Sequence, residues 1–186
     1  RCARVGDGGE ARHSEAGGIG REVEALRSAQ DILALHSRRG SAFGPVNLVH
    51  ALHRVAGRGL RVACEQPAAG QLSRLLAELG ESLAQAERVF EPRHLANSAW
   101  ALARLAVRDR PLLQCISARA RSSILEFKSQ ELSNTAWAFA KLALRDAPLL
   151  DSLAAAALPR IRGAEPQHLA NTAWAFARLA VAHGPL

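Results

Sequence analysis

Apolar and polar positions recur along the second half of this 186-residue chain with one fixed spacing. Within each recurrence, the apolar residues lie three or four positions apart, which is typical of an amphipathic helix. Tryptophan marks the recurrence, because it occurs at Trp100, Trp137 and Trp174, 37 residues apart each time. A fixed period of this length predicts stacked helical units, each of which buries its apolar face against its neighbours.

Each unit is predicted to contain two helices. The first helices are expected to begin at Pro92, at Ser129 as an N-cap, and at Pro166, and to end at Val107, Leu144 and Val181. Turn residues followed by a proline then restart the chain at Asp109-Arg-Pro111 and Asp146-Ala-Pro148. These restarts predict second helices over about 111–124 and 148–158.

A more divergent copy precedes these units, with His50 in the place of tryptophan. Gln71–Val89 is expected to form an enlarged second helix broken at Gly80, and Arg21–Arg39 a preceding helical pair. The prediction is therefore an all-α fold, an α-solenoid of two-helix repeats over 21–186, after a disordered leader at 1–20. Its parts are a divergent unit at about 43–90, repeats at 91–127 and 128–164, and a truncated repeat at 165–186.

One side of each first helix carries a narrow polar stripe. On a helical wheel its members fall within about 60° of one another, between a broad apolar arc and a mixed side that includes Ser98, Ala101 and Leu105. Every unit contributes one asparagine together with cations or a further amide. The stripe comprises Arg93, Asn97, Arg104 and Arg108, then Gln130, Asn134, Lys141 and Arg145, then Gln167, Asn171 and Arg178, with Asn47, Arg54 and Arg58 upstream.

Two interpretations of this stripe remain open. Amides next to guanidinium groups suit base edges and phosphates, and sequence-reading helical repeats use two or three such side chains per base. Alternatively, Asn97, Asn134 and Asn171 bond backbone groups of the preceding loop and fix the packing of the repeats, while the cations only solvate an exposed face. For Trp100 and its equivalents, packing between repeats is favoured over base stacking.

Composition narrows the range of functions. The chain has 24 Lys and Arg against 17 Asp and Glu, a formal net charge of +7 that suits a polyanionic partner. Three scattered cysteines argue against a disulfide framework, and no apolar run is long enough to cross a bilayer. The seven histidines lack partners at metal-ligand spacing, so we expect no catalytic site, no metal, no cofactor and no small-molecule substrate.

The run Leu-Ala-Asn-Thr-Ala-Trp-Ala-Phe-Ala-Arg-Leu-Ala (169–180), with near copies from Leu95 and Leu132, resembles the organellar helical-repeat proteins. These include the octotricopeptide and heptatricopeptide repeats and the FAST-kinase-like leucine-rich and RAP-associated proteins, and a helical domain in a subunit of the trypanosomatid RNA-editing substrate-binding complex is similar. The resemblance covers residues 42–186 and rests on both the period and the Trp-Ala-Phe-Ala-Arg/Lys-Leu core.

The resemblance implies binding of single-stranded or ribosomal RNA in a mitochondrion or plastid, in transcript processing, stability, translation or ribosome assembly. It places RNA contacts at the asparagines and tryptophans of the repeats, and less so in the first unit, where His50 replaces tryptophan. Two alternatives remain. One is a protein-interaction scaffold among the subunits of an organellar ribonucleoprotein, and the other is a targeting arm for an enzyme encoded elsewhere.

Overall fold

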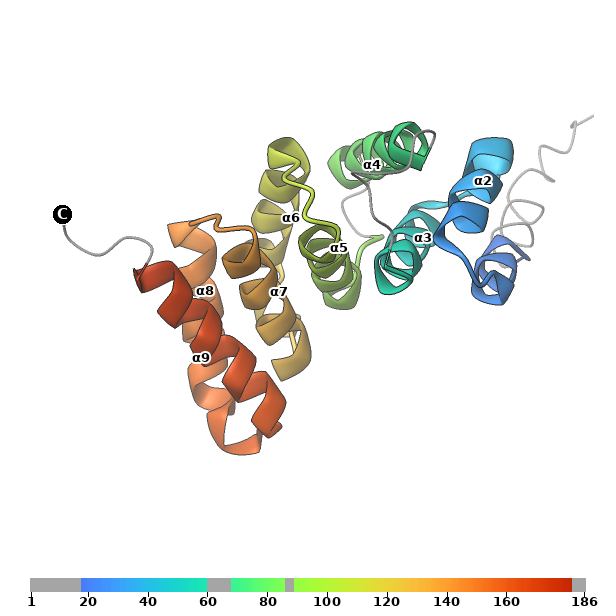
Figure 1. Ribbon diagram of the computed structural model, residues 1–186. Coiled ribbons are helices and arrows are strands. Elements are labelled where there is room, and N and C mark those ends of the chain that lie inside the picture. The colour runs from blue at the N-terminus through green and yellow to red at the C-terminus, as the bar shows by residue number, and fades with distance from the viewer. Residues whose placement is uncertain (1–17, 60–67, 86–88, 182–186) are drawn as a thin grey trace, which may run out of the picture.

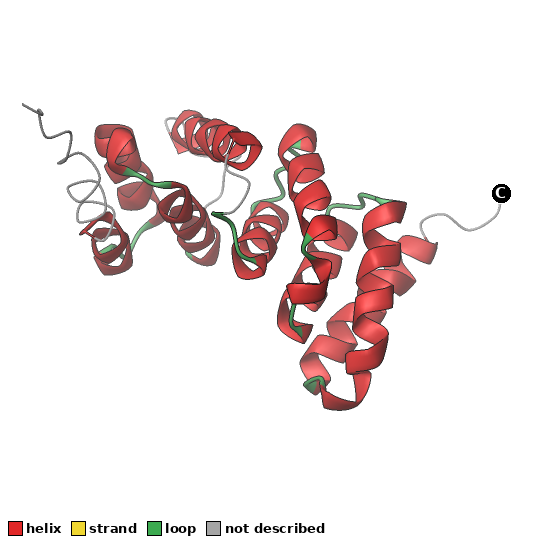
Figure 2. Cartoon of the chain, turned by 180° about the vertical axis from the view of Figure 1, so that it is seen from behind, coloured by secondary structure: helices red, strands yellow, loops and turns green. Residues whose placement is uncertain are grey.

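The computed structural model describes residues 18–59, 68–85 and 89–181. All regular secondary structure in these ranges is helical, so the all-α prediction is confirmed (Figure 2). Most of the predicted leader, residues 1–17, lies outside the described residues. The leader was predicted to extend to residue 20, but residues 18–25 already form a helix, in which Ile19 and Val23 are buried.

The helical segments follow one another along the chain with short connections between most of them. After the helix of residues 18–25 come α2 (Ala29–Arg39), η1 (Gly40–Ala42), α3 (Pro45–Gly57), α4 (Ala68–Gln85), α5 (Pro92–Arg104), α6 (Arg110–Ser122), η2 (Ile124–Glu126), α7 (Ser129–Lys141), α8 (Ala147–Ala157), η3 (Leu158–Gly163) and α9 (Pro166–Val181). The predicted helical pair over 21–39 therefore exists.

The helices form two rows (Figure 1). The A row contains α3, α5, α7 and α9, in which each helix packs against the next; the B row contains α2, α4, α6 and α8, with contacts from each member to the next. Side contacts such as α5 with α6 and α7 with α8 join the two rows. Three A-row helices begin at Pro92, Ser129 and Pro166, so their starts repeat the spacing of the sequence.

Acidic N-caps start the B-row helices α6 and α8. The carboxylate of Asp109 accepts a hydrogen bond from the Leu112 backbone N–H (3.0 Å), and Asp146 accepts one from Leu149 (3.1 Å). Both satisfy an N–H group that has no partner inside the helix, and a proline at the second helical position fits the same turn. These starts follow the predicted turn chemistry.

The start of α7 differs from its prediction. Ser129 was expected to be the N-cap, but Lys128 occupies that position and Ser129 is the first helical residue. The reason is the side chain of Glu131, whose carboxylate accepts the Lys128 backbone N–H at 2.9 Å and so anchors the chain one residue earlier.

The ends of α5 and α7 also differ, since both helices stop three residues before the predicted Val107 and Leu144. Ala106 and Ala143 adopt left-handed backbone angles, with φ of 55° and 53°. The Val107 N–H then bonds the Leu102 carbonyl at 2.9 Å, and α7 repeats this bond from Leu144 to Phe139. This Schellman motif closes each helix although alanine stands where glycine is usual. The motif depends on the left-handed backbone at Ala106 and Ala143. The pattern of apolar residues does not indicate this conformation, so it could not predict where the two helices end.

The predicted break at Gly80 is wrong, because α4 runs without interruption from Ala68 to Gln85. A glycine inside a helix costs about 1 kcal/mol relative to alanine. The buried side chains Leu76, Leu79 and Leu83 on either side of it outweigh that cost, since each fully buried leucine contributes about 1.5–3 kcal/mol.

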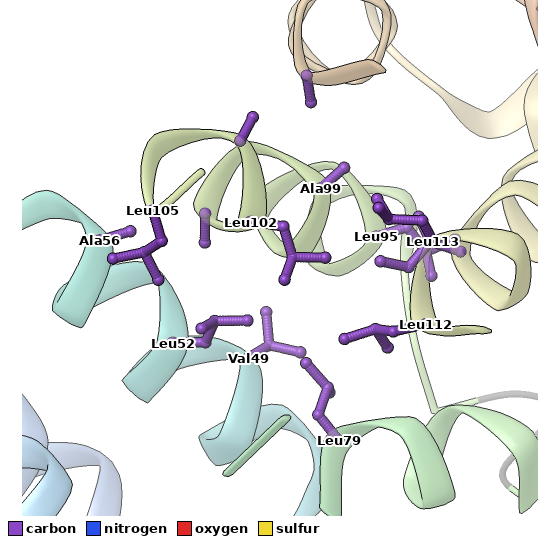
Figure 3. Packing of buried hydrophobic residues seen from close by; sticks show 14 of the residues in the cluster. Val49, Leu52, Ala56, Leu79, Leu95, Ala99, Leu102, Leu105, Leu112 and Leu113 are labelled. Carbon is purple, nitrogen blue, oxygen red and sulfur yellow. The ribbon is translucent and has the colours of Figure 1, made fainter. Parts of the chain in front are cut away.

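The core lies between the two rows and continues between neighbouring A-row helices. Figure 3 shows Leu95 and Leu102 of α5 among side chains of α3, α4 and α6. The side of α5 that looked mixed in the sequence is buried as well, because Ser98 and Ala101 are at most 1% exposed. Small side chains let adjacent A-row helices approach closely. The alanines therefore contribute to the core by allowing close packing of the helices, although each side chain fills little volume.

Candidate nucleic-acid interface

The stripe is what remains accessible on an A-row helix after both of its flanks are covered. In α5, Ala96 and Ala103 are buried on one flank and Ala101 on the other. Between these flanks, Asn97 is half-buried and Arg104 is exposed. The same alternation holds in α7. Burial therefore leaves one line of polar side chains along each interior A-row helix, at the wheel positions expected from the sequence.

The asparagines of this line do not form the backbone ladder of the structural alternative. Asn97, Asn134 and Asn171 are each half-buried. Within the described ranges, none of their side-chain amides takes part in a hydrogen bond. Their donor and acceptor atoms are therefore available to a ligand. Asn47 in the divergent unit differs, since it already has an interaction partner.

The cations of the stripe divide into two kinds. Arg104 and Lys141 are exposed, and no hydrogen bond or ion pair within the described part of the chain involves them. Arg178 instead donates its Nε–H to the carbonyl of Ala140 in α7 at 3.1 Å, and Arg54 donates to the carbonyls of Glu24 (2.6 Å) and Leu26 (3.2 Å). These two arginines satisfy carbonyls near the C-terminal ends of earlier helices, Arg178 at α7 and Arg54 at the helix of residues 18–25. Sequence reasoning missed this second role.

Trp100 and Trp174 each lie beside the cation of their own unit. The Arg104 guanidinium carbon lies 5.5 Å from the centre of the Trp100 ring, and the corresponding distance from Arg178 to Trp174 is 5.6 Å. Both distances fit a cation–π contact. Trp100 and Trp137 are half-buried against the core, in agreement with the packing interpretation, whereas Trp174 is 43% exposed.

Two predicted members of the stripe do not belong to it. Because α5 ends at Arg104 and α7 at Lys141, Arg108 and Arg145 lie in the loops that follow and no longer share the helical face. Arg145 lines a separate hollow of about 500 Å³ together with Arg110 and Asp146. The early helix ends described above explain this correction.

The N-terminal end of the stripe is less uniform. Arg93 is exposed, and its Nε lies 3.0 Å from a carboxylate oxygen of Glu91, so its charge is partly compensated. Gln130 and Gln167 at the equivalent position are exposed. Positive charge is thus concentrated near the C-terminal ends of the A-row helices.

Histidines lie next to the stripe without entering it. The Nδ1 atom of His94 accepts the Glu91 backbone N–H at 3.1 Å, which requires a neutral ring. Burial, followed by the positive charge of Arg93, lowers the pKa of His94 below its ordinary 6.5 despite the opposing charge of Glu91. Burial likewise lowers the pKa values of His50 and His53. The centres of the His53 and Trp100 rings lie 4.8 Å apart, which makes a contact between neighbouring units. The sequence pattern did not predict this contact.

Three further features of the described residues concern metal ligands, cysteines and helix length. Within residues 18–59, 68–85 and 89–181, no group of three or more His, Cys, Asp or Glu side chains is placed to hold a metal ion. Of the three cysteines, Cys115 is described, and it is a half-buried free thiol on α6. Among the described helices, none has both the length and the apolar character needed to cross a bilayer.

Comparison of the chain with protein-family models and with curated protein sequences gives no match.

Proposed function

We propose that this chain is a non-catalytic RNA-binding helical-repeat protein of organellar RNA metabolism. Its two rows of helices would form an α-solenoid with a 37-residue period, and the stripe would contact single-stranded or ribosomal RNA. The observation that carries this proposal is the pairing, in successive units, of an unbonded asparagine amide with an exposed cation on the accessible line of the A row.

The chemistry of this line suits RNA for two reasons. Arg104 and Lys141 carry charge that no described acidic group neutralises, so binding a phosphate would not require breaking an ion pair. The amides of Asn97 and Asn134 can each donate and accept, which matches the edges of unpaired bases. The net charge of +7 adds long-range attraction for a polyanion.

The tryptophans add a third type of contact. Trp174, which is 43% exposed, offers an indole face next to Arg178. Stacking of a base on an aromatic ring contributes about 1–3 kcal/mol in single-strand binding. Trp100 and Trp137 offer less ring surface, because packing between units already uses part of it.

The test is titration of a labelled mixed-sequence single-stranded RNA with the double variant Arg104→Glu/Lys141→Glu. Arg178 stays unchanged because it bonds α7. We expect affinity to fall on the order of tenfold or more, and the dependence of log K on log salt to become shallower by about 1.4, for two lost phosphate contacts.

The matched control is Arg121→Glu/Arg162→Glu, which makes the same charge change at exposed positions outside the stripe. The proposal requires this control to retain most of the affinity. Equal losses in both variants would show that only the total charge matters. Unchanged affinity in the stripe variant would remove the stripe from RNA binding.

A second variant addresses the asparagines. Asn134→Ala should change the preference among RNA sequences and leave the melting temperature nearly unchanged, because the amide has no described hydrogen bond to lose. A lower melting temperature with unaltered sequence preference would instead assign this residue to repeat packing.

A further inference from the structure

A glutamine and an asparagine recur as a pair in the stripe. Gln130 and Asn134 lie four residues apart in α7, and Gln167 and Asn171 hold the same positions in α9. Residues four apart on a helix share one face, with about 5–6 Å between their Cβ atoms. Both glutamines are exposed, and no hydrogen bond within the described part of the chain involves these side-chain amides. Two successive units therefore offer the same pair of amide groups to a ligand.

Helix α5 carries half of this pair. Its asparagine, Asn97, is half-buried and has no described side-chain hydrogen bond. Arg93 stands in the place of the glutamine, with its Nε 3.0 Å from a carboxylate oxygen of Glu91. The divergent unit lacks the pair, because Phe43 is buried at the glutamine position and Asn47 already has an interaction partner. The amide chemistry is thus shared by α5, α7 and α9 and absent from the divergent unit.

Units that contact a strand with the same side chains select the same base. In helical repeats that bind one base per unit, two or three side chains of that unit choose the base. The asparagine does not vary among α5, α7 and α9, and the glutamine is common to the last two. The ligand that this repetition favours is a run of one nucleotide, because every unit of the stripe then meets the base that it selects.

Adenine is the base whose hydrogen-bonding groups match two amides. A side-chain amide carries a donor and an acceptor next to each other, so it pairs with an adjacent acceptor and donor on a base. Adenine presents such a combination twice, as N6–H with N1 on the Watson–Crick edge and as N6–H with N7 on the Hoogsteen edge. On these two edges, cytosine, uracil and guanine present it only on the Watson–Crick edge. Asparagine or glutamine paired with N6 and N7 is also the usual contact to adenine in the major groove.

We propose that the stripe binds a run of adenines in single-stranded RNA, an inference that rests on the proposed function and names its ligand. In α7 and α9 the asparagine and the glutamine contact the two edges of one adenine. N1 and N7 lie on either side of the amino group, so two amides one helical turn apart can each pair with one hydrogen of N6. Asn97 contacts its adenine through one edge. Arg104 and Lys141, which are exposed, bind the phosphates between the bases.

The first test compares RNAs of different base composition. Labelled oligoadenylate, oligouridylate, oligocytidylate and a mixed-sequence RNA of equal length are titrated with the intact chain by fluorescence anisotropy. We expect oligoadenylate to bind at least about tenfold more tightly than the others, since each bidentate base contact discriminates by a factor of about five or more. Equal affinities, or tighter binding of uridylate or cytidylate, would overturn the adenine proposal and leave RNA binding standing. No binding of any RNA would refute the proposed function and this inference with it.

Atomic substitutions in the RNA separate recognition of the base edges from stacking. In oligoadenylate, 7-deazaadenine removes the N7 acceptor and 1-deazaadenine removes N1, while both keep the flat ring and the amino group. Each replacement should weaken binding by at least about fivefold. In the variant Gln130→Ala/Gln167→Ala, one of the two replacements should no longer change the affinity, because that edge has lost its partner. Unchanged binding of both replaced strands by the parent chain, or retention of both sensitivities in the variant, would overturn the contact with two edges.

Gln114→Ala is the matched control, because Gln114 is an exposed glutamine on α6 outside the stripe. The preference for oligoadenylate should stay within about twofold of the parent in this control and fall at least about fivefold in Gln130→Ala/Gln167→Ala. The salt dependence of the affinity should be the same in both variants, since neither removes a charge. A fall of equal size in both variants would show that the stripe glutamines do not set the preference and would overturn the proposal.

Discussion

Helices α7 and α9 have almost the same sequence and different surroundings. Over Ser129–Lys141 and Pro166–Arg178 they are identical at nine of thirteen positions. The phenylalanine of α7, Phe139, is 2% exposed, whereas Phe176 of α9 is only half-buried. Likewise Ala140 is fully buried and Ala177 is exposed. The difference shows that burial in this fold depends on the neighbouring helix at least as much as on local sequence.

The contrast also separates two properties of a repeated helix: whether its surface is apolar, and whether a neighbouring helix covers that surface. Apolar residues in a repeated helix indicate a surface that can be covered, and a neighbour decides whether it is. Helix α7 contacts both α8 and α9, whereas α9 has an open side in the described part of the chain. Matched substitutions at equivalent positions of the two helices measure this contribution of the neighbours directly.

The largest expected difference concerns the leucine near the start of each helix. Leu132→Ala should lower the free energy of unfolding by about 2–5 kcal/mol, because it removes a buried side chain and leaves a cavity. Leu169→Ala should cost less than about 1 kcal/mol, since this side chain is 37% exposed and water can fill the space. Urea unfolding of both variants checks the pair. Equal losses would contradict the difference in burial.

The cation at the C-terminal end of the two helices comes next. Arg178→Ala should destabilise the protein by about 1–2 kcal/mol, because it removes a hydrogen bond to Ala140 of α7 and a cation–π contact with Trp174. Lys141→Ala should have an effect within about 0.5 kcal/mol. Thermal unfolding of both single variants is the measurement. A larger effect at Lys141 would reverse the assignment of the structural and the free cation.

The same substitution is expected to have opposite signs at two equivalent alanines. Ala143 has φ of 53° after the end of α7, so Ala143→Gly should stabilise by about 0.5–1 kcal/mol through relief of left-handed strain. Ala180, at the same repeat position, lies inside α9, so Ala180→Gly should destabilise by about 1 kcal/mol. Guanidinium unfolding resolves both signs. Two effects of the same sign would show that the helix ends are placed wrongly.

The smallest effect depends on pH and concerns the residue at the third helical position. In α7 this residue is Glu131, and in α5 it is His94, which accepts a backbone hydrogen bond in its neutral form. Because the folded pKa of His94 lies below 6.5, the unfolded chain binds more protons in the window under 6.5. The free energy of unfolding should therefore be highest above pH 6.5 and decrease as the pH falls below it. His94→Gln should make this dependence of the unfolding free energy on pH less steep. An unchanged slope would assign it to His50 and His53, whose pKa values are also lowered.

Sequence was sufficient where one residue type determines the local geometry. The prolines at 92 and 166 marked helix starts, and the turn residues and prolines at 109–111 and 146–148 marked restarts of the chain, because these residues act on the adjacent backbone. Sequence was insufficient where the answer depends on a neighbour or on strain. Nothing local distinguishes Ala143, which ends a helix, from Ala180, which continues one.

The site shows the same division. Periodicity placed Asn97, Asn134 and Asn171 on one line, and the structure leaves their amides without described hydrogen bonds. Periodicity could not predict the hydrogen bond from Arg178 to the Ala140 carbonyl of α7, because the two residues are 38 positions apart in the chain. It also assigned Arg108 and Arg145 to the stripe by extending a helix that the backbone had already ended.

The placement of one tryptophan in each of α5, α7 and α9 makes unfolding observable separately at these three helices. Trp100, Trp137 and Trp174 differ in their neighbours, since the first has the His53 ring at 4.8 Å and the third is 43% exposed. Variants that keep a single indole would report local solvent access separately in α5, α7 and α9. If the stack opens from the α9 end, the emission of Trp174 should shift to longer wavelength at a lower denaturant concentration than that of Trp100.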